Sequence, residues 1–152
     1  DTITFCFSKG LGAPVGSMVC STREVVGEAH RLRKRLGGGM RQAGVLAAAA
    51  SVALDTGVER LAEDHANARR LAAGLADLHP DAVELPSVET NMVYLELTPW
   101  QKTSSEISHE LEAHGVLTLG LHAKRMRLVT HRDVSTADID RSLTALRTVL
   151  CD

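Results

Sequence analysis

Ile-Thr-Phe-Cys-Phe-Ser-Lys-Gly-Leu-Gly-Ala-Pro-Val-Gly-Ser is the sequence of residues 3–17, and the interpretation of the whole chain begins there. β-Branched and aromatic residues at 3–7 predict a strand, glycine and proline at 9–16 predict a turn, and residues 17–20 predict a second strand. Lys9 therefore stands at a strand tip in a glycine-rich loop, where the backbone can come close to a ligand. A lysine amine in such a place is a candidate Schiff-base nucleophile. The same local pattern also fits a solvated lysine that opens a turn.

Composition limits the classes of partner that we expect. The 152 residues are 44% hydrophobic and 24% charged, with a net charge of -2, so nothing favours nucleic acid or an anionic membrane as partner. The longest apolar run, residues 45–54, is too short to cross a bilayer, and no signal-peptide pattern is visible. Three cysteines without metal-ligand spacing, Cys6, Cys20 and Cys151, predict free thiols, no metal site and a cytoplasmic, reducing environment.

The first half of the chain predicts helices that are separated by glycine. Ser21 or Thr22 is the expected N-cap of a helix that runs to about Leu36. A basic run at residues 31–35 suits the C-terminal end of this helix, although one of its cations could face an anionic ligand.

Three consecutive glycines at residues 37–39 predict a tight or mobile loop before the next helix. Backbone N–H groups of such a loop favour an anion, and Arg41 would add further donors. A plain linker would give the same pattern. Further helices are expected over residues 42–54, which are rich in alanine, and over residues 58–78.

The second half predicts a small α+β domain. Residues 90–97 alternate as a strand does, and Thr103 with Glu106 resembles a capping box that opens a helix ended by Gly115. The remaining elements are expected as a strand at 116–119, a strand at 126–130 and a helix at 136–150.

Four motifs, in order along the chain, resemble those of one enzyme family. They are residues 7–17 (Phe-Ser-Lys-Gly-Leu-Gly-Ala-Pro-Val-Gly-Ser), 33–44 (Arg-Lys-Arg-Leu-Gly-Gly-Gly-Met-Arg-Gln-Ala-Gly), 90–93 (Thr-Asn-Met-Val) and 127–134 (Arg-Leu-Val-Thr-His-Arg-Asp-Val). Over essentially the whole chain, they resemble the low-specificity L-threonine aldolases, which are fold type I pyridoxal phosphate enzymes. Arg132 departs from the pattern, because the family usually has leucine there.

The resemblance implies an α/β fold class, namely the C-terminal portion of an aspartate aminotransferase-like fold. Residues 1–80 would form the C-terminal part of the large cofactor-binding domain, and residues 81–152 a small α+β domain. The resemblance also implies a homodimer or homotetramer that acts on a small amino-acid substrate in threonine degradation and glycine biosynthesis.

The resemblance also implies a role for each matching residue. Lys9 would be the catalytic lysine that binds pyridoxal 5'-phosphate covalently, and Lys34 and Arg41 would lie near the cofactor phosphate. Arg127 would hold the substrate α-carboxylate with its guanidinium fork. L-Threonine or L-allo-threonine would then be cleaved to glycine and an aldehyde. His131 is given no catalytic role.

The chain begins at Asp1 without an initiator methionine and almost inside a strand, so we expect the C-terminal part of a longer or processed sequence. In this family, the ring-stacking histidine, the aspartate that pairs with the pyridine nitrogen and the main phosphate-binding loop precede the lysine. Residues 1–152 alone are therefore expected neither to bind the cofactor tightly nor to turn over substrate. Two alternatives stay open: another β-eliminating lyase of this fold type, and an inactive remnant that acts as an interaction module.

Overall fold

The computed structural model describes residues 1–151, except the side chain of Leu121, and it divides into two compact units, Asp1–Leu61 and Ala62–Asp152. Each unit has its own cluster of buried apolar side chains. The units divide at Leu61, whereas the sequence places a domain boundary after residue 80. The assignment of residues 1–80 to a large cofactor-binding domain stays a prediction.

The first unit is a β-hairpin followed by two helices. Its elements are β1 (Ile3–Cys6), β2 (Ser17–Cys20), α1 (Arg23–Arg35) and α2 (Gly44–Gly57). The strands pair antiparallel, with Ile3 opposite Cys20 and Cys6 opposite Ser17, which confirms the predicted hairpin. Thr22 is the N-cap of α1, because its hydroxyl accepts a hydrogen bond from the N–H of Val25 at 3.4 Å.

Glycine ends α1, as the sequence predicted, and the structure shows that it does so in a Schellman motif. Gly37 has a φ of 85°, in the left-handed region that glycine adopts without a steric penalty. The N–H of Gly38 donates to the carbonyl of Arg33 at 2.9 Å, and the N–H of Gly37 donates to that of Lys34 at 3.2 Å. The glycine loop therefore turns back over the last turn of α1.

The buried core of the first unit is small and consists of Phe7, Ala13 and Ala53. None of the residues of α1 is buried in the described chain. Leu36, just after α1, is 85% exposed, and Val45 of the alanine-rich α2 is 74% exposed. Most of the apolar surface of these two helices thus faces outward.

The second unit packs three helices on a three-stranded antiparallel sheet. Its elements are α3 (Leu61–Ala76), the short 3-10 helices η1 (Leu85–Ser87) and η2 (Thr98–Trp100), β3 (Met92–Glu96), α4 (Ser104–Ala113), β4 (Leu119–His122), β5 (Arg125–Val129) and α5 (Thr136–Cys151). The strand order is β3-β5-β4. None of the described helices has the length and apolar character needed to span a lipid bilayer.

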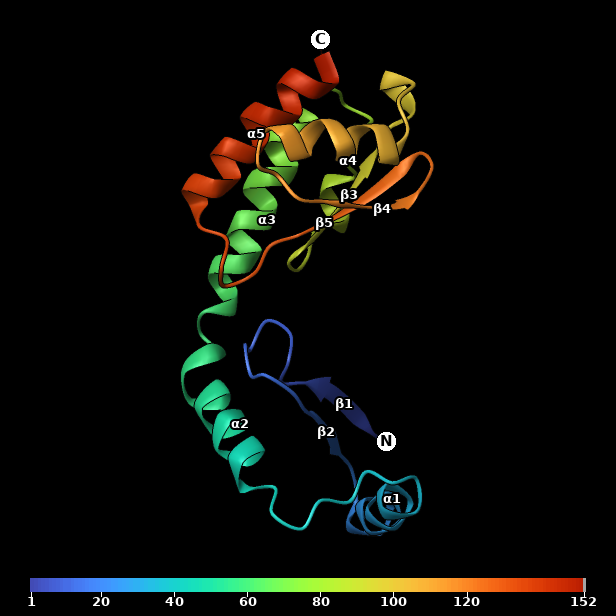
Figure 1. The fold of residues 1–152 in the computed structure, drawn as a ribbon, viewed down its shortest axis with the longest axis vertical. Helices are drawn as coiled ribbons and strands as arrows, with labels where there is room; N and C mark the ends of the chain where they lie inside the picture. The colour runs from blue at the N-terminus through green and yellow to red at the C-terminus, as the bar shows by residue number, and fades with distance from the viewer. Residues whose placement is uncertain (152) are drawn as a thin grey trace. The chain divides into compact units, whose positions relative to one another are not determined.

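The core of the second unit lies between one face of this sheet and the three helices α3, α4 and α5 (Figure 1). Met126 and Leu128 of β5 point into it, whereas Arg125, Arg127 and Val129 lie on the opposite face, because successive side chains of a strand alternate between its two faces. The fully buried side chains include Leu75, Leu95, Leu97, Ile107, Leu111 and Leu146. The second unit therefore has the ordinary apolar core that the first unit lacks.

One strand was predicted in the wrong place. The sequence suggested residues 116–119, but β4 runs from Leu119 to His122. The N–H of Val116 donates to the carbonyl of Leu111 at 3.0 Å, and the hydroxyl of Thr118 bonds to that of Ser108 at 3.1 Å. Residues 116–118 are therefore tied to α4, so pairing with β5 begins only where Leu119 lies opposite Arg127.

The predicted capping box at the start of α4 is confirmed. The hydroxyl of Thr103 accepts the N–H of Glu106 at 3.3 Å, and the carboxylate of Glu106 accepts the N–H of Thr103 at 2.7 Å. The hydroxyl of Thr103 also donates to this carboxylate. These bonds from Thr103 hold the pKa of Glu106 below its usual value.

Thr103→Ala is expected to lower the free energy of unfolding by about 1 kcal/mol at pH 7, since the N-cap hydroxyl is lost. The pKa of Glu106 is lowered by folding, so its contribution is complete above the unfolded value of about 4.3 and disappears as the pH falls through the folded value. Chemical denaturation at pH 7 and pH 3 should therefore show a smaller effect of Thr103→Ala at pH 3. Ser105→Ala, at the next exposed serine of α4, is the control and should have little effect at either pH.

Candidate active site

Lys9 lies on the loop that joins β1 to β2, and its side chain is exposed. The loop is closed by backbone hydrogen bonds: Gly12 N–H to Lys9 carbonyl at 2.8 Å, Ala13 N–H to Phe7 carbonyl at 2.9 Å and Phe7 N–H to Gly16 carbonyl at 3.0 Å. Gly12 and Gly16 have φ angles of 79° and 123°, which explains why glycine occupies these positions. The loop thus presents the amine of Lys9 on a well-defined backbone.

Helix α2 packs against this loop. Phe7 and Ala13 are buried against Ala53, on the face of α2 that meets the loop. At the end of α2, a Cβ on Gly57 would lie 3.0 Å from the carbonyl oxygen and 3.4 Å from the Cα of Leu11. A side chain at this position would press on the backbone of Leu11, so glycine allows the Lys9 loop and α2 to pack closely.

Gly57→Val is expected to destabilise the protein by about 1–3 kcal/mol, because the added side chain has to displace backbone rather than a flexible side chain. Thermal or chemical denaturation measures this loss. Gly44→Ala, at the first residue of the same helix, is the matched control because its Cβ would meet nothing within 4 Å. Equal effects of the two variants would contradict the close packing of Leu11 on α2.

Lys34 and Arg41 flank the glycine loop of the first unit. A Cβ on Gly39 would lie 2.7 Å from Cδ of Lys34, so the bare backbone of Gly39 packs against the side chain of this lysine. Within residues 1–151, no ion pair joins Lys9, Lys34 or Arg41 to a carboxylate of the chain, so their charges are available to an anion. No hydrogen bond among these residues unites them, and their membership of one site stays a prediction.

Arg127, in the second unit, lines a hollow of about 780 Å³. It lies on β5 opposite Tyr94 of β3 and Leu119 of β4. Residues 116–118, which precede β4, line the hollow, and its apolar wall includes Leu117, which is 82% exposed. A single guanidinium group in a mostly apolar hollow suits a ligand that carries one carboxylate.

Arg125, the neighbouring cation on the same face of β5, already has partners within the chain. Nε of Arg125 lies 2.8 Å from a carboxylate oxygen of Glu96, and its guanidinium carbon lies 4.6 Å from the centre of the Tyr94 ring. Among the described residues, no such carboxylate pairs with Arg127. Arg127 therefore keeps a guanidinium charge that can bind a ligand carboxylate, whereas the charge of Arg125 is already paired with Glu96.

The two later sequence motifs are adjacent in space. Met92 lies opposite Val129 in the sheet, the N–H of Thr130 donates to the carbonyl of Asn91 at 3.0 Å, and the side-chain amide of Asn91 donates to the carbonyl of Thr130 at 2.7 Å. His131, which follows, also lines the hollow of Arg127. Its Nδ1 accepts the N–H of Asp133 at 3.3 Å, a bond that fits a role in the local turn.

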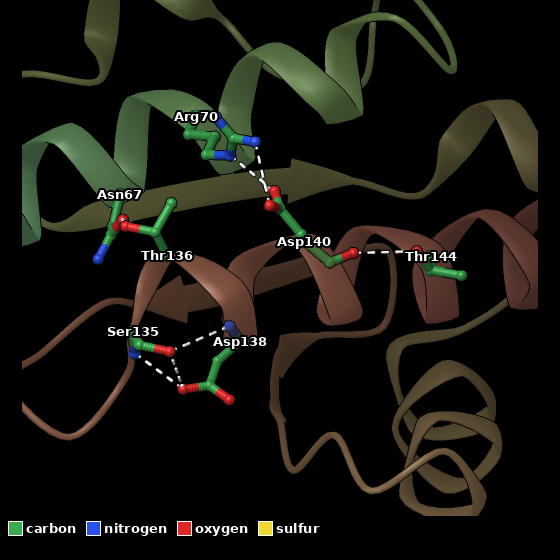
Figure 2. A network of polar contacts seen from close by, with 7 residues as sticks. All are labelled: Asn67, Arg70, Ser135, Thr136, Asp138, Asp140 and Thr144. Atoms are coloured by element: carbon green, nitrogen blue, oxygen red, sulfur yellow. Dashed lines mark hydrogen bonds and ion pairs between the residues drawn. The ribbon is translucent and has the colours of Figure 1, made fainter.

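The sequence interpretation missed two polar residues in the apolar stripe of α3. Asp64 and Asn67 are 1% and 2% exposed, as deeply buried as Ala68 and Leu71 beside them. Asp64 lies four residues before Ala68 and Asn67 lies four residues before Leu71, and this helical spacing was the available signal. Asn67 accepts a hydrogen bond from the hydroxyl of Thr136 at 2.9 Å, at the start of α5 (Figure 2).

Close to Asn67, an ion pair between Arg70 and Asp140 joins α3 to α5 (Figure 2). Arg70 donates to both carboxylate oxygens of Asp140, at 2.6 and 3.0 Å, and this partner raises the pKa of Arg70 above its usual value. Ser135 donates to Asp138 from its hydroxyl and its N–H, and these bonds lower the pKa of Asp138. The start of α5 is therefore capped and tied to α3.

Comparison with known proteins identifies what these elements resemble. A family model described as beta-eliminating lyase matches residues 1–98. Low-specificity L-threonine aldolase 1 of Arabidopsis thaliana is 38% identical over 148 residues, which are 97% of this chain and 41% of that protein. The predicted resemblance to the low-specificity L-threonine aldolases is therefore confirmed.

Solved structures agree with the predicted fold class. A candidate L-allo-threonine aldolase of Listeria monocytogenes gives a TM-score of 0.72 at 20% identity, over 99% of this chain and 45% of that one. A structure of SPT that carries PLP gives 0.70 at 20% identity, over 98% of this chain and 40% of that one. These likenesses confirm an α/β fold that forms part of the aspartate aminotransferase-like architecture.

The chain spans about two fifths of the Arabidopsis aldolase, and the family model covers residues 1–98, which include the Lys9 loop and the glycine loop. The chain belongs to the beta-eliminating lyase family.

Proposed function

We propose that the protein carrying this chain is a pyridoxal phosphate-dependent carbon–carbon lyase that cleaves L-threonine or L-allo-threonine to glycine and acetaldehyde. The observation that carries the proposal is the 38% identity to a low-specificity L-threonine aldolase over 97% of the chain. The geometry of the Lys9 loop and of the Arg127 hollow supports it. In this proposal, residues 1–152 supply part of the active site.

The residues of the first unit fit the cofactor in their chemistry. Lys9 offers an exposed amine on a closed loop, which an aldehyde can reach. The bare glycine backbone beside Lys34 leaves room that a Cβ on Gly39 would fill, and Lys34 with Arg41 supplies the positive charge that a phosphate requires. When bound, pyridoxal phosphate supplies the electron sink that accepts the electrons of the broken Cα–Cβ bond.

The remaining roles belong to side chains of this chain. Arg127 binds the α-carboxylate of the amino acid with two parallel N–H donors, which limits rotation about the Cα–carboxylate bond and orients the scissile bond. Lys34 and Arg41 hold the phosphate and thereby position the reacting end of the cofactor. Lys9 would hold the cofactor, and its amine is the group of this chain that would accept or return a proton.

β-Elimination is the second candidate, because the family model itself is described as beta-eliminating lyase. The two reactions share Lys9 and Arg127 and differ in the bond broken at Cβ. Product analysis therefore separates them, whereas cofactor binding does not.

The test is an assay of the purified full-length protein that carries residues 1–152, not of these residues alone, with pyridoxal phosphate and each of L-threonine and L-allo-threonine. We expect glycine and acetaldehyde in equal amounts. Pyruvate and ammonia from amino acids with a β-leaving group, without acetaldehyde from threonine, would replace the proposal by β-elimination. A protein that neither retains the cofactor nor releases any of these products would contradict both and favour the interaction-module alternative.

The proposal extends to assembly and location. We place the enzyme in the cytoplasm as a homodimer or homotetramer that contributes to threonine degradation and glycine biosynthesis. The free, exposed thiols of Cys6, Cys20 and Cys151 support a reducing compartment, and the exposed apolar side chains of α1 and α2 support burial against further protein surface. Sedimentation equilibrium tests the oligomer, and a monomer at micromolar concentration would contradict it.

A further inference from the structure

The loop at residues 130–135 forms one wall of the Arg127 hollow. Thr130, His131 and Val134 of this loop line the hollow together with Arg127. The loop begins directly after β5 ends at Val129, so it continues the strand that carries the arginine. The shape of the hollow around Arg127 therefore depends on how this loop is held.

The first end of the loop is fixed by Thr130. This residue is 1% exposed, and its hydroxyl donates to the carbonyl of Asp64 in α3 at 2.7 Å. Its N–H and carbonyl are both bonded to Asn91, at 3.0 and 2.7 Å. Thr130, the residue that follows β5, is therefore held by α3 and by Asn91, the residue that precedes β3.

The second end of the loop is fixed by Asn67. The side-chain amide of Asn67 donates to the carbonyl of Val134 at 3.3 Å, and its side-chain oxygen accepts from the hydroxyl of Thr136 at 2.9 Å. Figure 2 shows Asn67 of α3 facing Thr136, close to the Ser135 and Asp138 cap of α5. One buried side chain therefore bonds to the backbone of the residue before Ser135 and to the side chain of the residue after it.

A packing role alone does not account for this choice of residue. Asn67 is 2% exposed among apolar neighbours, where an aliphatic side chain would pack without the need for hydrogen bonds. A buried amide is tolerated because its donor and its acceptor are both satisfied. Both of its partners belong to the segment that follows the Arg127 strand.

We propose that Asn67 is a positioning residue for the substrate carboxylate. It holds Val134 and Thr136, keeps the wall of the hollow in place and so fixes the space in which Arg127 receives the carboxylate. The inference rests on the proposed function, because it assumes that Arg127 binds the amino acid. It assigns no contact between Asn67 and substrate or cofactor.

The test measures ligand affinity in the purified, cofactor-loaded protein by calorimetry, with glycine as the carboxylate-bearing probe and methylamine as the probe without a carboxylate. Asn67→Ala should weaken glycine binding about tenfold or more, because a small displacement of a positioning contact is costly. Methylamine affinity and the visible absorption of the bound cofactor should stay unchanged. Thr136→Val, which removes one of the two bonds and leaves Asn67 intact, should weaken glycine binding in the same direction.

Arg70→Ala is the matched control, since it breaks another link between α3 and α5 one helical turn away and touches no residue of the loop. It should leave both affinities unchanged. Glycine affinity within a factor of two of the parent in both test variants, or an equal loss for methylamine, would overturn the inference. A parent protein without the cofactor absorption band would instead overturn the proposed function, and the inference with it.

Discussion

Lys9→Ala is expected to abolish covalent attachment of pyridoxal phosphate and to lower kcat/KM for threonine cleavage by at least about a thousandfold. The loop that carries Lys9 is closed by its own backbone bonds and supported by Phe7 and Ala53, so loss of one exposed side chain should leave it folded. The visible absorption of the bound cofactor and the rate of acetaldehyde release measure the two effects.

Lys9→Arg is the control for charge. It keeps a cation at the strand tip but replaces the amine that condenses with an aldehyde. Lys9→Arg should lose cofactor attachment and threonine cleavage as completely as Lys9→Ala. Its circular dichroism spectrum should remain that of the parent protein. Retention of more than about a tenth of the activity by either variant would remove Lys9 from the proposed chemistry.

Arg127→Ala is expected to raise KM for the amino acid by about a hundredfold. Hydrogen bonds to a charged group are worth about 1.5–3 kcal/mol, and each tenfold change in affinity corresponds to about 1.4 kcal/mol. Arg127 is exposed on β5, so its loss should change the unfolding temperature little. Steady-state kinetics over a wide range of threonine concentration measures KM separately from kcat.

Arg125→Ala is the matched control on the same strand and face. Its guanidinium is already bonded to Glu96 and stacked on Tyr94, so we expect KM to change less than about threefold. Arg127→Lys should recover only part of the loss, because an ammonium group lacks the bidentate geometry. Equal effects of the two alanine variants would show that Arg127 has no special role.

Local signals in the sequence predicted much of this structure. Thr22 and Thr103 begin α1 and α4 as the predicted N-caps, and Gly37 ends α1 in the left-handed conformation expected of glycine. These features depend on residues within one turn of each other, which is why the sequence shows them directly. The β1–β2 hairpin is likewise a local structure, since it is closed by the loop at residues 9–16.

Features that depend on distant partners could not be predicted in the same way. The start of β4 is set by bonds from Val116 and Thr118 to α4, and these compete with strand pairing. The burial of Asn67 depends on Thr136, which is 69 residues away in sequence. Lys9, Lys34, Arg41 and Arg127 were singled out by motif, and their shared site is supported by resemblance rather than by a contact between them.

The most direct test of the central claim, that Lys9 anchors the cofactor, is borohydride reduction of the cofactor-loaded protein followed by proteolysis and mass spectrometry. We predict a single phosphopyridoxyl group, located on the peptide that contains Lys9 and absent from the Lys9→Arg variant. An adduct on Lys34, Lys102 or Lys124 in place of Lys9 would contradict the account.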